Sequence, residues 1–387
     1  MKISRRHFIG SSGSLFLMGS PSTNVRAQSL GKRNLIVISL KGGMDGLAAV
    51  PYLGDDSLRK ARPNIQVNTK LKLTSEFYLH PKLSSIYQLW KENKASVIHA
   101  TSIPYTGRSH FEGQNLMETG GDSPFEYGTG WLGRGIDVAG LEGLAISLPM
   151  PILLRSNQNP DNFYPTTRPL PSDDKLDMIL ASYSDAPLLS QTMKKVINRP
   201  INLMEGIVAG QNKNKSADTE TLTHIAGEEL SRNDGPRIAV LEIVGFDTHA
   251  SQGGEDGQHA DKLGSLDRVF SNLKKGLGDA FDNTLILTLT EFGRTIEQNG
   301  GYGTEHGYGS AIIAAGGLLK KAQVYTDWPG LKKKDLFEGR DLNVTLDARS
   351  VYCAAMAACF DTDFEKLRRE AFFGANLKDV TTDLFNV

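Results

Sequence analysis

The sequence predicts an α/β fold in which a mostly parallel β-sheet is sandwiched between helices. Several short apolar runs are almost uninterrupted, as is typical of strands that are covered on both faces. These runs alternate with longer segments in which apolar residues recur at helical spacing. The chain has 387 residues, which is enough to build one large α/β domain.

Strands and helices are expected in alternation along the chain. The apolar runs that predict strands lie at residues 34–40, 95–100, 237–244, 284–290 and 311–315. The segments that predict helices lie at residues 81–91, 109–118, 257–277 and 348–360. Cys353 and Cys359 fall on the last of these helices and point to different sides of it, so we expect them to be buried and unpaired.

The region from residue 141 to residue 234 breaks this alternation. Prolines interrupt it repeatedly, and residues 211–216 are polar. A core strand follows it directly. We therefore expect an insertion made of loops and short helices within a single domain that spans residues 32–387.

The first 27 residues are predicted to be an export signal. They contain four basic residues and no acidic ones, and residues 4–9 read Ser-Arg-Arg-His-Phe-Ile, a twin-arginine pattern. A modest apolar stretch follows, and small residues favour cleavage after Ala27. A disordered basic tail is the alternative interpretation. The signal predicts export by the twin-arginine translocation machinery and a periplasmic or extracellular location.

Charge and hydropathy argue against two other classes of protein. The net charge of the chain is −1, and the leader alone contributes four positive charges, so the remainder is acidic overall. This balance argues against nucleic acid as a partner. No apolar run reaches the roughly 20 residues of a membrane-spanning helix, so we expect no stable membrane span.

Four short polar segments each follow a strand-like apolar run and together carry the residue types of a metal site. They occupy residues 42–45, 246–249, 290–294 and 303–307. Because loops that follow parallel strands converge on one edge of a sheet, side chains distant in the sequence can meet there. A mixture of carboxylates and imidazoles suits zinc or manganese better than calcium. The candidate ligands of a divalent metal are Asp45, Asp247, His249, Glu291 and His306.

Each candidate also has a structural interpretation. Asp45 could cap the segment that follows its Gly-Gly turn, and Asp247 could form an Asx turn. Glu291 could pair with Arg294, three residues later. His306 could be idle in a glycine-rich, solvated loop.

The segment at residues 108–112 suggests a catalytic hydroxyl and an anion contact. Ser109 and Glu112 fit a capping box that begins a helix. A hydroxyl at a helix N-terminus is also well placed to attack a phosphoryl or sulfuryl centre, because the local amides favour an anion. Arg108 and Arg294 are candidates for stabilising that anion.

Six segments, taken in order, resemble a large bacterial family of exported proteins of unknown function that is related to the alkaline phosphatase and sulfatase superfamily. The resemblance extends from about Lys32 to the C-terminus and implies an alkaline-phosphatase-like fold. The segments are residues 40–47 (LKGGMDGL), 109–114 (SHFEGQ), 246–249 (FDTH), 291–295 (EFGRT), 303–307 (GTEHG) and 341–349.

The resemblance implies two metal sites. One would consist of Asp45, Ser109 and Glu291, and the other of Asp247, His249 and His306. This sequence departs from the superfamily at Phe292, which stands where a histidine ligand is usual, and His110 or Glu305 are the candidates for that vacancy. Asp247 and His249 are also closer together than in the usual pattern.

The leading hypothesis is an exported, metal-dependent hydrolase of phosphate or sulfate esters, with a small anionic ester as its substrate. The departure at Phe292 favours an alternative. In that alternative the protein is a catalytically inactive member of the superfamily that acts in binding or assembly outside the cytoplasm.

Overall fold

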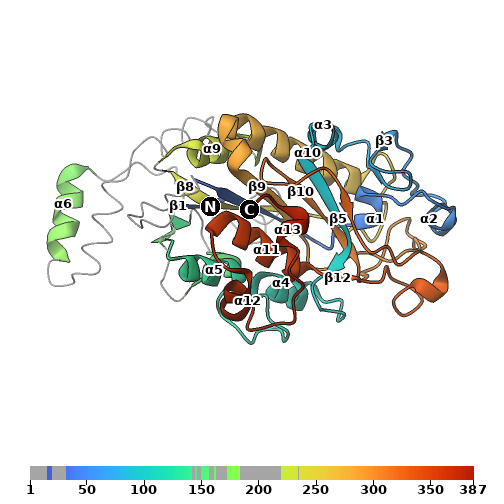
Figure 1. The fold of residues 1–387 in the computed structure, drawn as a ribbon. Coiled ribbons are helices and arrows are strands. Elements are labelled where there is room, and N and C mark those ends of the chain that lie inside the picture. The colour runs from blue at the N-terminus through green and yellow to red at the C-terminus, as the bar shows by residue number, and fades with distance from the viewer. Residues whose placement is uncertain are drawn as a thin grey trace, which may run out of the picture.

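The centre of the molecule is an eight-stranded sheet with helices on both faces, which confirms the predicted α/β class (Figure 1). The computed structural model describes residues 15–19, 32–141, 144–145, 150–156, 161–162, 172–183, 219–233 and 235–387. In spatial order the strands are β1 (Leu15–Gly19), β8 (Pro236–Val244), β2 (Asn34–Lys41), β9 (Thr284–Leu289), β10 (Ser310–Ala315), β5 (Ala95–Ser102) and β11 (Val324–Tyr325); β12 (Leu346–Asp347) also pairs with β5.

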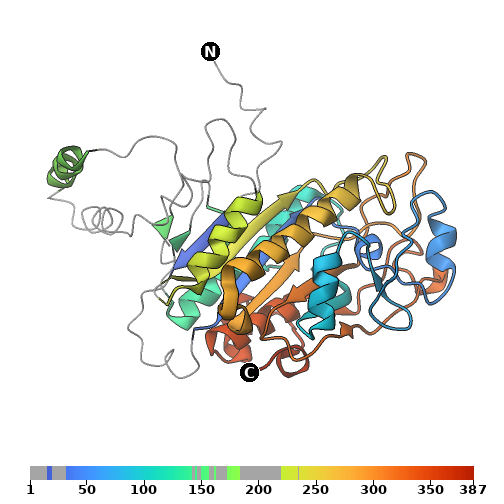
Figure 2. The same ribbon diagram turned by 90° about the horizontal axis from the view of Figure 1, so that it is seen from above.

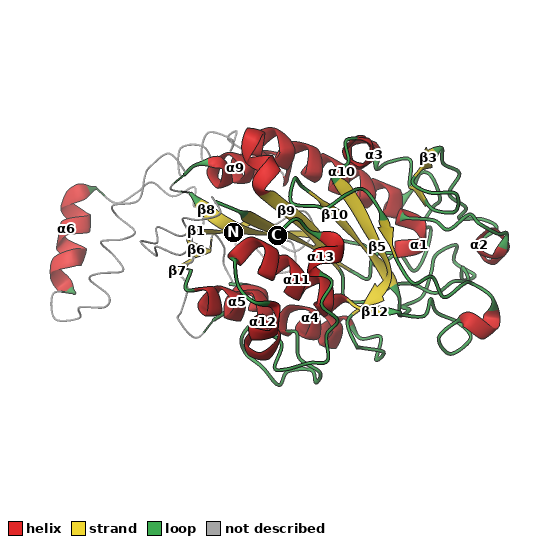
Figure 3. Ribbon diagram, in the orientation of Figure 1, coloured by secondary structure: helices red, strands yellow, loops and turns green. Residues whose placement is uncertain are grey.

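The strand directions bring the carboxyl ends of four strands and the start of a fifth to one edge of the sheet. The four are β2, β5, β8 and β9, and the fifth is β10. Strand β2 pairs in parallel with β8 and β9, whereas β10 runs antiparallel between β9 and β5. The start of β10 therefore lies beside the carboxyl ends of its neighbours. Most long loops lie on the side of the molecule that holds α1 (Gly46–Ala49) and α2 (Ser57–Ala61), directly after β2 (Figure 3).

Two layers of helices cover the sheet, and alternate residues of each strand face one layer or the other. In β2, Leu35 and Val37 join one apolar core, whereas Ile36 and Ile38 join the second. Figure 1 shows the two layers on opposite faces of the sheet, and Figure 2 looks down on the face that α9 and α10 cover. The first core packs on α4 (His110–Thr119), α5 (Trp131–Ala139), α11 (Ala348–Phe360), α12 (Phe364–Ala371) and α13 (Thr381–Leu384); the second packs on α3 (Ser84–Lys91), α9 (Thr219–Ser231) and α10 (Gln258–Leu277).

Small elements complete the described part of the chain. Two short strand pairs, β3 with β4 and β6 with β7, lie outside the main sheet. These strands are β3 (Leu71–Lys72), β4 (Tyr78–Leu79), β6 (Leu144–Ala145) and β7 (Asp161–Asn162). The remaining described helix is α6 (Asp173–Ser182), and three 3₁₀ segments occupy Ile152–Leu154, Gly278–Asn283 and Lys333–Asp335.

Two predicted regions fall largely outside the described residues. Within residues 1–27, the predicted export signal, only β1 is described, and it pairs antiparallel with β8. Most of the insertion expected at residues 141–234 is likewise outside the described ranges. Both therefore stay predictions.

The prediction for the two cysteines is confirmed, whereas one predicted helix begins later than expected. Cys353 and Cys359 are both buried and free on α11. The helix expected at residues 81–91 begins later, at Ser84. Among the described residues, no helix combines the length and hydropathy that crossing a membrane requires.

Candidate functional site

Four sheet strands deliver the histidines and acids of the site to one edge of the sheet. Strand β5 leads to His110, which is the first residue of α4, and β8 leads to Asp247 and His249. Glu291 follows β9, and His306 precedes the antiparallel β10. Because β10 runs opposite to its neighbours, its entry loop meets their exit loops.

Three imidazoles converge on one oxygen of Asp247. The Nε2 atoms of His249, His306 and His110 lie 2.9, 3.1 and 3.3 Å from Asp247 Oδ1. The Nε2 atoms of His249 and His306 are 2.9 Å apart. The four side chains are partly open to solvent, and that of Asp247 is 42% exposed. We call these four residues the histidine cluster.

The opposite nitrogen of each imidazole is held by an acceptor. Nδ1 of His110 lies 2.8 Å from Glu291 Oε1, and Nδ1 of His249 lies 2.7 Å from Glu305 Oε2. Nδ1 of His306 lies 2.7 Å from the carbonyl oxygen of Arg108. Acceptors at these positions favour a proton on each Nδ1, so in the neutral rings the Nε2 lone pairs face the centre of the cluster.

Phe292 and the histidine rings pack against one another. The Phe292 ring centroid lies 5.0 Å from that of His110 and 4.9 Å from that of His306. The rings of His110 and His306 are themselves 4.3 Å apart. Phe292 therefore forms an apolar wall behind two imidazoles. Nε2 of His110 is buried and has no hydrogen-bond partner, which is unusual for a buried polar atom.

The local charges favour a cation in the cluster. Burial acts to raise the pKa of Asp247, but the Arg294 guanidinium at 2.6 Å and the His110 ring outweigh it and lower the pKa to about 2. The hydrogen bond to Glu291 raises the pKa of His110, whereas burial lowers the pKa of His306. A hydrogen bond from Asn299 lowers the pKa of Glu305.

Glu291 orients His110 and does not face the centre of the cluster. Its side chain is fully buried, and Oε1 accepts hydrogen bonds from Gly42 N and Gln114 Nε2 as well as from His110. Burial alone would raise the pKa of Glu291, but these hydrogen bonds, led by that of His110, lower it. The geometry thus gives Glu291 a supporting role in place of the predicted role as a ligand.

Asp45 lies in a separate, closed network, which corrects its prediction as a metal ligand. It is 1% exposed, and Oδ1 caps α1 by accepting from the Leu47 and Ala48 amides. Oδ2 accepts from Arg62 Nη1 at 2.7 Å and from Gln252 Nε2 at 2.7 Å. Both oxygens are therefore occupied by donors, and the capping interpretation is the one that the geometry supports.

Gln252 joins this closed network to the loops of the histidine cluster. Its Oε1 accepts from Thr248 Oγ1 at 3.0 Å and from Thr304 Oγ1 at 2.7 Å. Thr248 lies between Asp247 and His249 in the chain. Sequence reasoning missed this residue, because an uncharged glutamine in a loop carries no signal that separates it from a surface residue.

Both candidate arginines already contact acidic side chains. Arg294 is buried and donates to the carbonyls of Gly42, Gly43, Phe246 and Thr304 and to Asp247. It therefore fastens the strand-end loops together. Arg108 pairs with Glu338 at 2.5 Å and with Asp341 at 2.9 Å. Arg294 therefore has a structural role in this arrangement, whereas the predicted transition-state role of Arg108 stays a prediction.

Ser109 precedes His110 as the N-cap residue of α4, but its side chain makes no capping bond. The predicted capping box is therefore wrong. Glu112 accepts a hydrogen bond from the Tyr105 hydroxyl at 2.6 Å, and the Ser109 amide donates to the same hydroxyl. The structure leaves the prediction of a nucleophilic Ser109 untested.

Backbone strain accompanies the site. Arg108, Ser251 and Tyr302 adopt positive φ angles of 58°, 49° and 58°. Each such conformation costs about 1–3 kcal/mol for a residue other than glycine. At Arg108 this conformation accompanies the bond from its carbonyl oxygen to His306.

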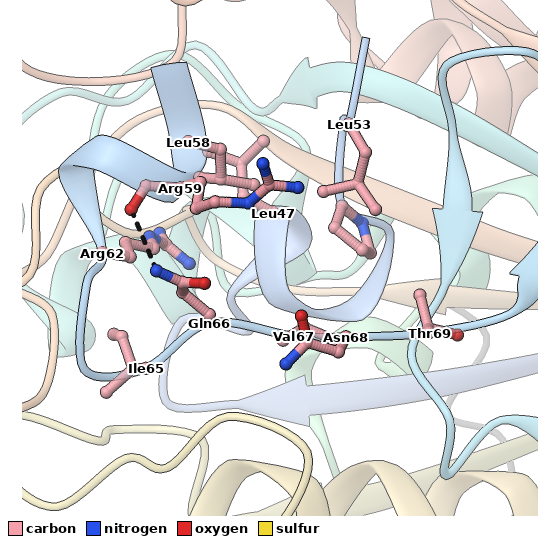
Figure 4. A pocket seen from close by; sticks show the side chains of 11 residues that line it. Leu47, Leu53, Leu58, Arg59, Arg62, Ile65, Gln66, Val67, Asn68 and Thr69 are labelled. Atoms are coloured by element: carbon pink, nitrogen blue, oxygen red, sulfur yellow. Dashed lines mark hydrogen bonds between the residues drawn. The ribbon is translucent and has the colours of Figure 1, made fainter. Parts of the chain in front are cut away.

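A cavity of about 190 Å³ lies beside α1 and α2, apart from the histidine cluster (Figure 4). Its walls are mixed, with Arg59, Arg62 and Gln66 among the polar lining residues. The Arg62 guanidinium is already engaged by Asp45 and by two backbone carbonyls. The cavity holds none of the cluster residues, so it is not part of the candidate site.

The fold and the site define an α/β protein with a histidine and carboxylate cluster at the carboxyl edge of its sheet. The chain belongs to the family described as "Protein of unknown function (DUF1501)", whose model matches residues 171–365. The matched range contains Asp247, His249 and His306, whereas His110 lies outside it.

Among solved structures, the chain is similar to the C-terminal periplasmic domain of EcEptC from Escherichia coli, crystallised in complex with Zn. The two share 9% sequence identity, and the match covers 77% of this chain and 75% of that chain with a TM-score of 0.32. A TM-score this low supports no inference about chemistry. A comparison with curated proteins found no significant match.

Proposed function

We propose that this protein is an exported, metal-dependent hydrolase of phosphate or sulfate esters, with one divalent cation bound by the histidine cluster. The observation that carries the proposal is the convergence of three imidazole Nε2 atoms on Asp247 Oδ1. Three lone pairs and an anionic oxygen repel one another unless protons or a cation lie between them. A divalent cation supplies the positive charge.

The distances within the cluster suit a small metal ion. Zinc binds imidazole nitrogen at about 2.0–2.1 Å, so two nitrogens of a tetrahedral site lie about 3.3 Å apart. The Nε2 atoms of His249 and His306 are 2.9 Å apart, and those of the three histidines lie within 3.3 Å of the carboxylate oxygen. These separations are equal to or slightly shorter than that spacing, so a small outward movement of the ligands would give the geometry of a zinc or manganese site.

The charge balance also suits a divalent ion. Asp247, Glu291 and Glu305 carry three negative charges around the cluster, and Arg294 carries one positive charge. With neutral imidazoles, two negative charges are left over. One divalent cation neutralises them.

The residues of the cluster would divide the work of hydrolysis among them. Glu291, Glu305 and the Arg108 carbonyl hold the imidazoles with Nε2 turned inward, and Arg294 keeps Asp247 ionised. When bound, a divalent cation supplies Lewis-acid polarisation of the ester and activation of water at neutral pH. The partly exposed cluster admits a small anionic ester from solvent. Ser109, next to His110, is the candidate for an attacking hydroxyl.

Export and kinship form part of the same proposal. The twin-arginine pattern at residues 4–9 supports handling by the twin-arginine translocation machinery and a periplasmic or extracellular location. The order of the sequence motifs supports kinship with the alkaline phosphatase and sulfatase superfamily. Twin-arginine export of folded protein would allow the metal to be bound before the chain leaves the cytoplasm.

The first test is the metal content of full-length protein purified without chelators, followed by assays on an aryl phosphate and an aryl sulfate. We expect about one zinc or manganese per chain and hydrolysis of one ester. His306→Ala is expected to remove the metal and the activity together. His224→Ala, on α9, is the matched control and is expected to change neither. Metal content near zero, with no change of stability in chelator, would contradict the proposal.

Both arginines predicted to contact the substrate are engaged by the protein, and this favours a second candidate function. In this alternative the chain is an inactive member of the superfamily that uses the metal centre for binding or assembly. Metal at full occupancy without hydrolysis of either ester would favour it. Hydrolysis that is lost with His306→Ala would exclude it.

A further inference from the structure

Two segments that build the histidine cluster also expose aromatic side chains to solvent. The Phe111 side chain is 85% exposed and that of Tyr302 is 55% exposed. We infer that Phe111 and Tyr302 bind the organic group of the substrate, and that this group is aromatic. The inference rests on the proposed function and narrows its substrate class to aryl esters.

Phe111 has no structural role that explains an aromatic residue. It lies in the first turn of α4, directly after His110, so the two Cα atoms are about 3.8 Å apart. A highly exposed phenylalanine buries almost no apolar surface, and alanine is a better helix former at such a position. Folding alone would therefore favour another residue beside the cluster.

Tyr302 occupies a position that folding would assign to glycine or asparagine. Its φ of 58° is uncommon for a bulky residue, and Gly301 and Gly303 flank it. Hydrogen bonds attach this loop to the His249 segment: Gln252 N donates to Tyr302 O at 2.9 Å, and Asn299 Nδ2 donates to His249 O at 2.8 Å. The strained tyrosine is thus fixed to the same loops as the cluster.

The two parts of an aryl ester match the two parts of this surface. The cluster takes the anionic ester end, whereas exposed rings offer flat faces on which another ring can stack. Asp247 and His249 are open to solvent, and the exposed rings of Phe111 and Tyr302 belong to the segments that carry His110 and that are bonded to the His249 loop. An aliphatic chain would gain burial at these rings but no stacking geometry, and this distinction separates the two substrate types.

The test measures binding by zinc-loaded, full-length protein and by its Phe111→Ala, Tyr302→Asn and double variants. Calorimetric titration measures the Kd of three probes, which are 2-naphthyl phosphate, hexyl phosphate and methyl phosphate. We expect the double variant to raise the Kd for 2-naphthyl phosphate roughly tenfold. The Kd for methyl phosphate is expected to stay unchanged. The thermal midpoint is expected not to fall, because both substitutions relieve unfavourable local conformations.

Phe125→Asn provides a matched control. Phe125 has a φ of 61° and is 66% exposed, but its loop supplies no side chain to the cluster. We expect this variant to leave all three dissociation constants unchanged. An unchanged Kd for 2-naphthyl phosphate in the double variant overturns the inference, and so does an equal loss of affinity for hexyl phosphate.

A chelator arm separates this inference from the proposed function. If wild-type protein binds 2-naphthyl phosphate equally well with and without zinc, while the double variant loses that binding, the metal proposal fails and the aromatic surface stands. If zinc is required and the double variant binds normally, the metal proposal stands and the aromatic surface fails. Wild-type protein that binds neither aryl nor methyl phosphate overturns both.

Discussion

Asp45 and Asp247 follow neighbouring parallel strands, contact an arginine and belong to similar-looking motifs, yet they lie in opposite environments. Asp45 is 1% exposed, and guanidinium, amide and backbone donors occupy both of its oxygens. Asp247 is 42% exposed, and three imidazole nitrogens surround one of its oxygens. Hydrogen-bond donors thus occupy both oxygens of Asp45, whereas imidazole nitrogens that can bind a cation surround Asp247 Oδ1.

The difference teaches what distinguishes a structural carboxylate from a ligand. A carboxylate that accepts only from donors with fixed hydrogens has its charge satisfied by the protein itself. Imidazoles whose Nδ1 atoms are already committed offer lone pairs, so among the side chains around Asp247 only Arg294 brings a permanent positive charge to its Oδ1. The identity of the partners, and not the position after a strand, decides the role.

The largest expected effect is on stability and concerns the closed network. Asp45→Asn leaves the buried Arg62 without its counter-charge, so we expect the free energy of unfolding to fall by about 3 kcal/mol or more. Asp247→Asn also removes a counter-charge, that of the buried Arg294, but Arg294 keeps four backbone carbonyl acceptors and Asp247 is partly exposed. We therefore expect a smaller loss of stability from Asp247→Asn, together with the loss of metal binding. Urea unfolding of chelator-treated protein, with metal titration, measures both. Equal destabilisation by the two substitutions would erase the contrast between the regions.

The next largest effect concerns a residue that holds an imidazole of the open cluster. Glu305→Gln weakens the acceptor at His249 Nδ1, and we expect metal affinity to fall by about 10- to 100-fold. Glu305 is partly exposed, so stability should hardly change. Glu297→Gln, an exposed glutamate of the same loop, is the control and should leave affinity unchanged. Competition with a chromogenic chelator supplies the dissociation constants.

Metal binding at the histidine cluster is also expected to depend on pH, because protons and a metal cation compete for the same imidazole nitrogens. The Glu291 hydrogen bond raises the pKa of His110 above 6.5. In metal-free protein the charged His110 ring therefore stabilises the fold. This stabilisation is complete below pH 6.5 and is lost as the pH rises through the raised pKa of His110. A metal needs the neutral ring.

We therefore expect the rise in thermal midpoint on adding zinc to grow between pH 5.5 and pH 8. Asp247, with its pKa of about 2, stays ionised throughout this range and contributes no slope. Thermal melts with and without zinc at several pH values measure the trend. A zinc-induced shift that is constant across the range would contradict proton competition at the cluster.

Much of the fold could be predicted from the sequence because its signals are local. The buried strands β2, β5, β8 and β9 are continuous apolar runs, and α10 repeats apolar residues at helical spacing. The direction of β10 could not be predicted, because a short apolar run carries no information about its neighbours. Its antiparallel placement is nevertheless what brings His306 to the site.

The site could be predicted only in part, for a related reason. Asp247, His249 and His306 were expected together and do meet, since each adjoins a strand end. Asp45 was misassigned because its partner Arg62 lies in an irregular segment that no pattern marks. His110 was only one of two candidates for a vacancy, since a helix-start histidine gives no sign of the direction of its ring.

The smallest expected effect tests whether the closed network supports the open one. Thr304 Oγ1 donates to Gln252 Oε1 at 2.7 Å in a fully buried position, two residues before His306. Thr304→Val removes this bond while Thr248 still satisfies the amide oxygen, so we expect a loss of about 1 kcal/mol in the free energy of unfolding. We also expect a fall of less than tenfold in metal affinity, because the His306 loop keeps its backbone bonds to residues 293 and 295. Urea unfolding and zinc titration of the same preparation measure the pair of changes. A Thr304→Val protein that loses stability but binds zinc as tightly as the wild type would show that the two networks are mechanically independent.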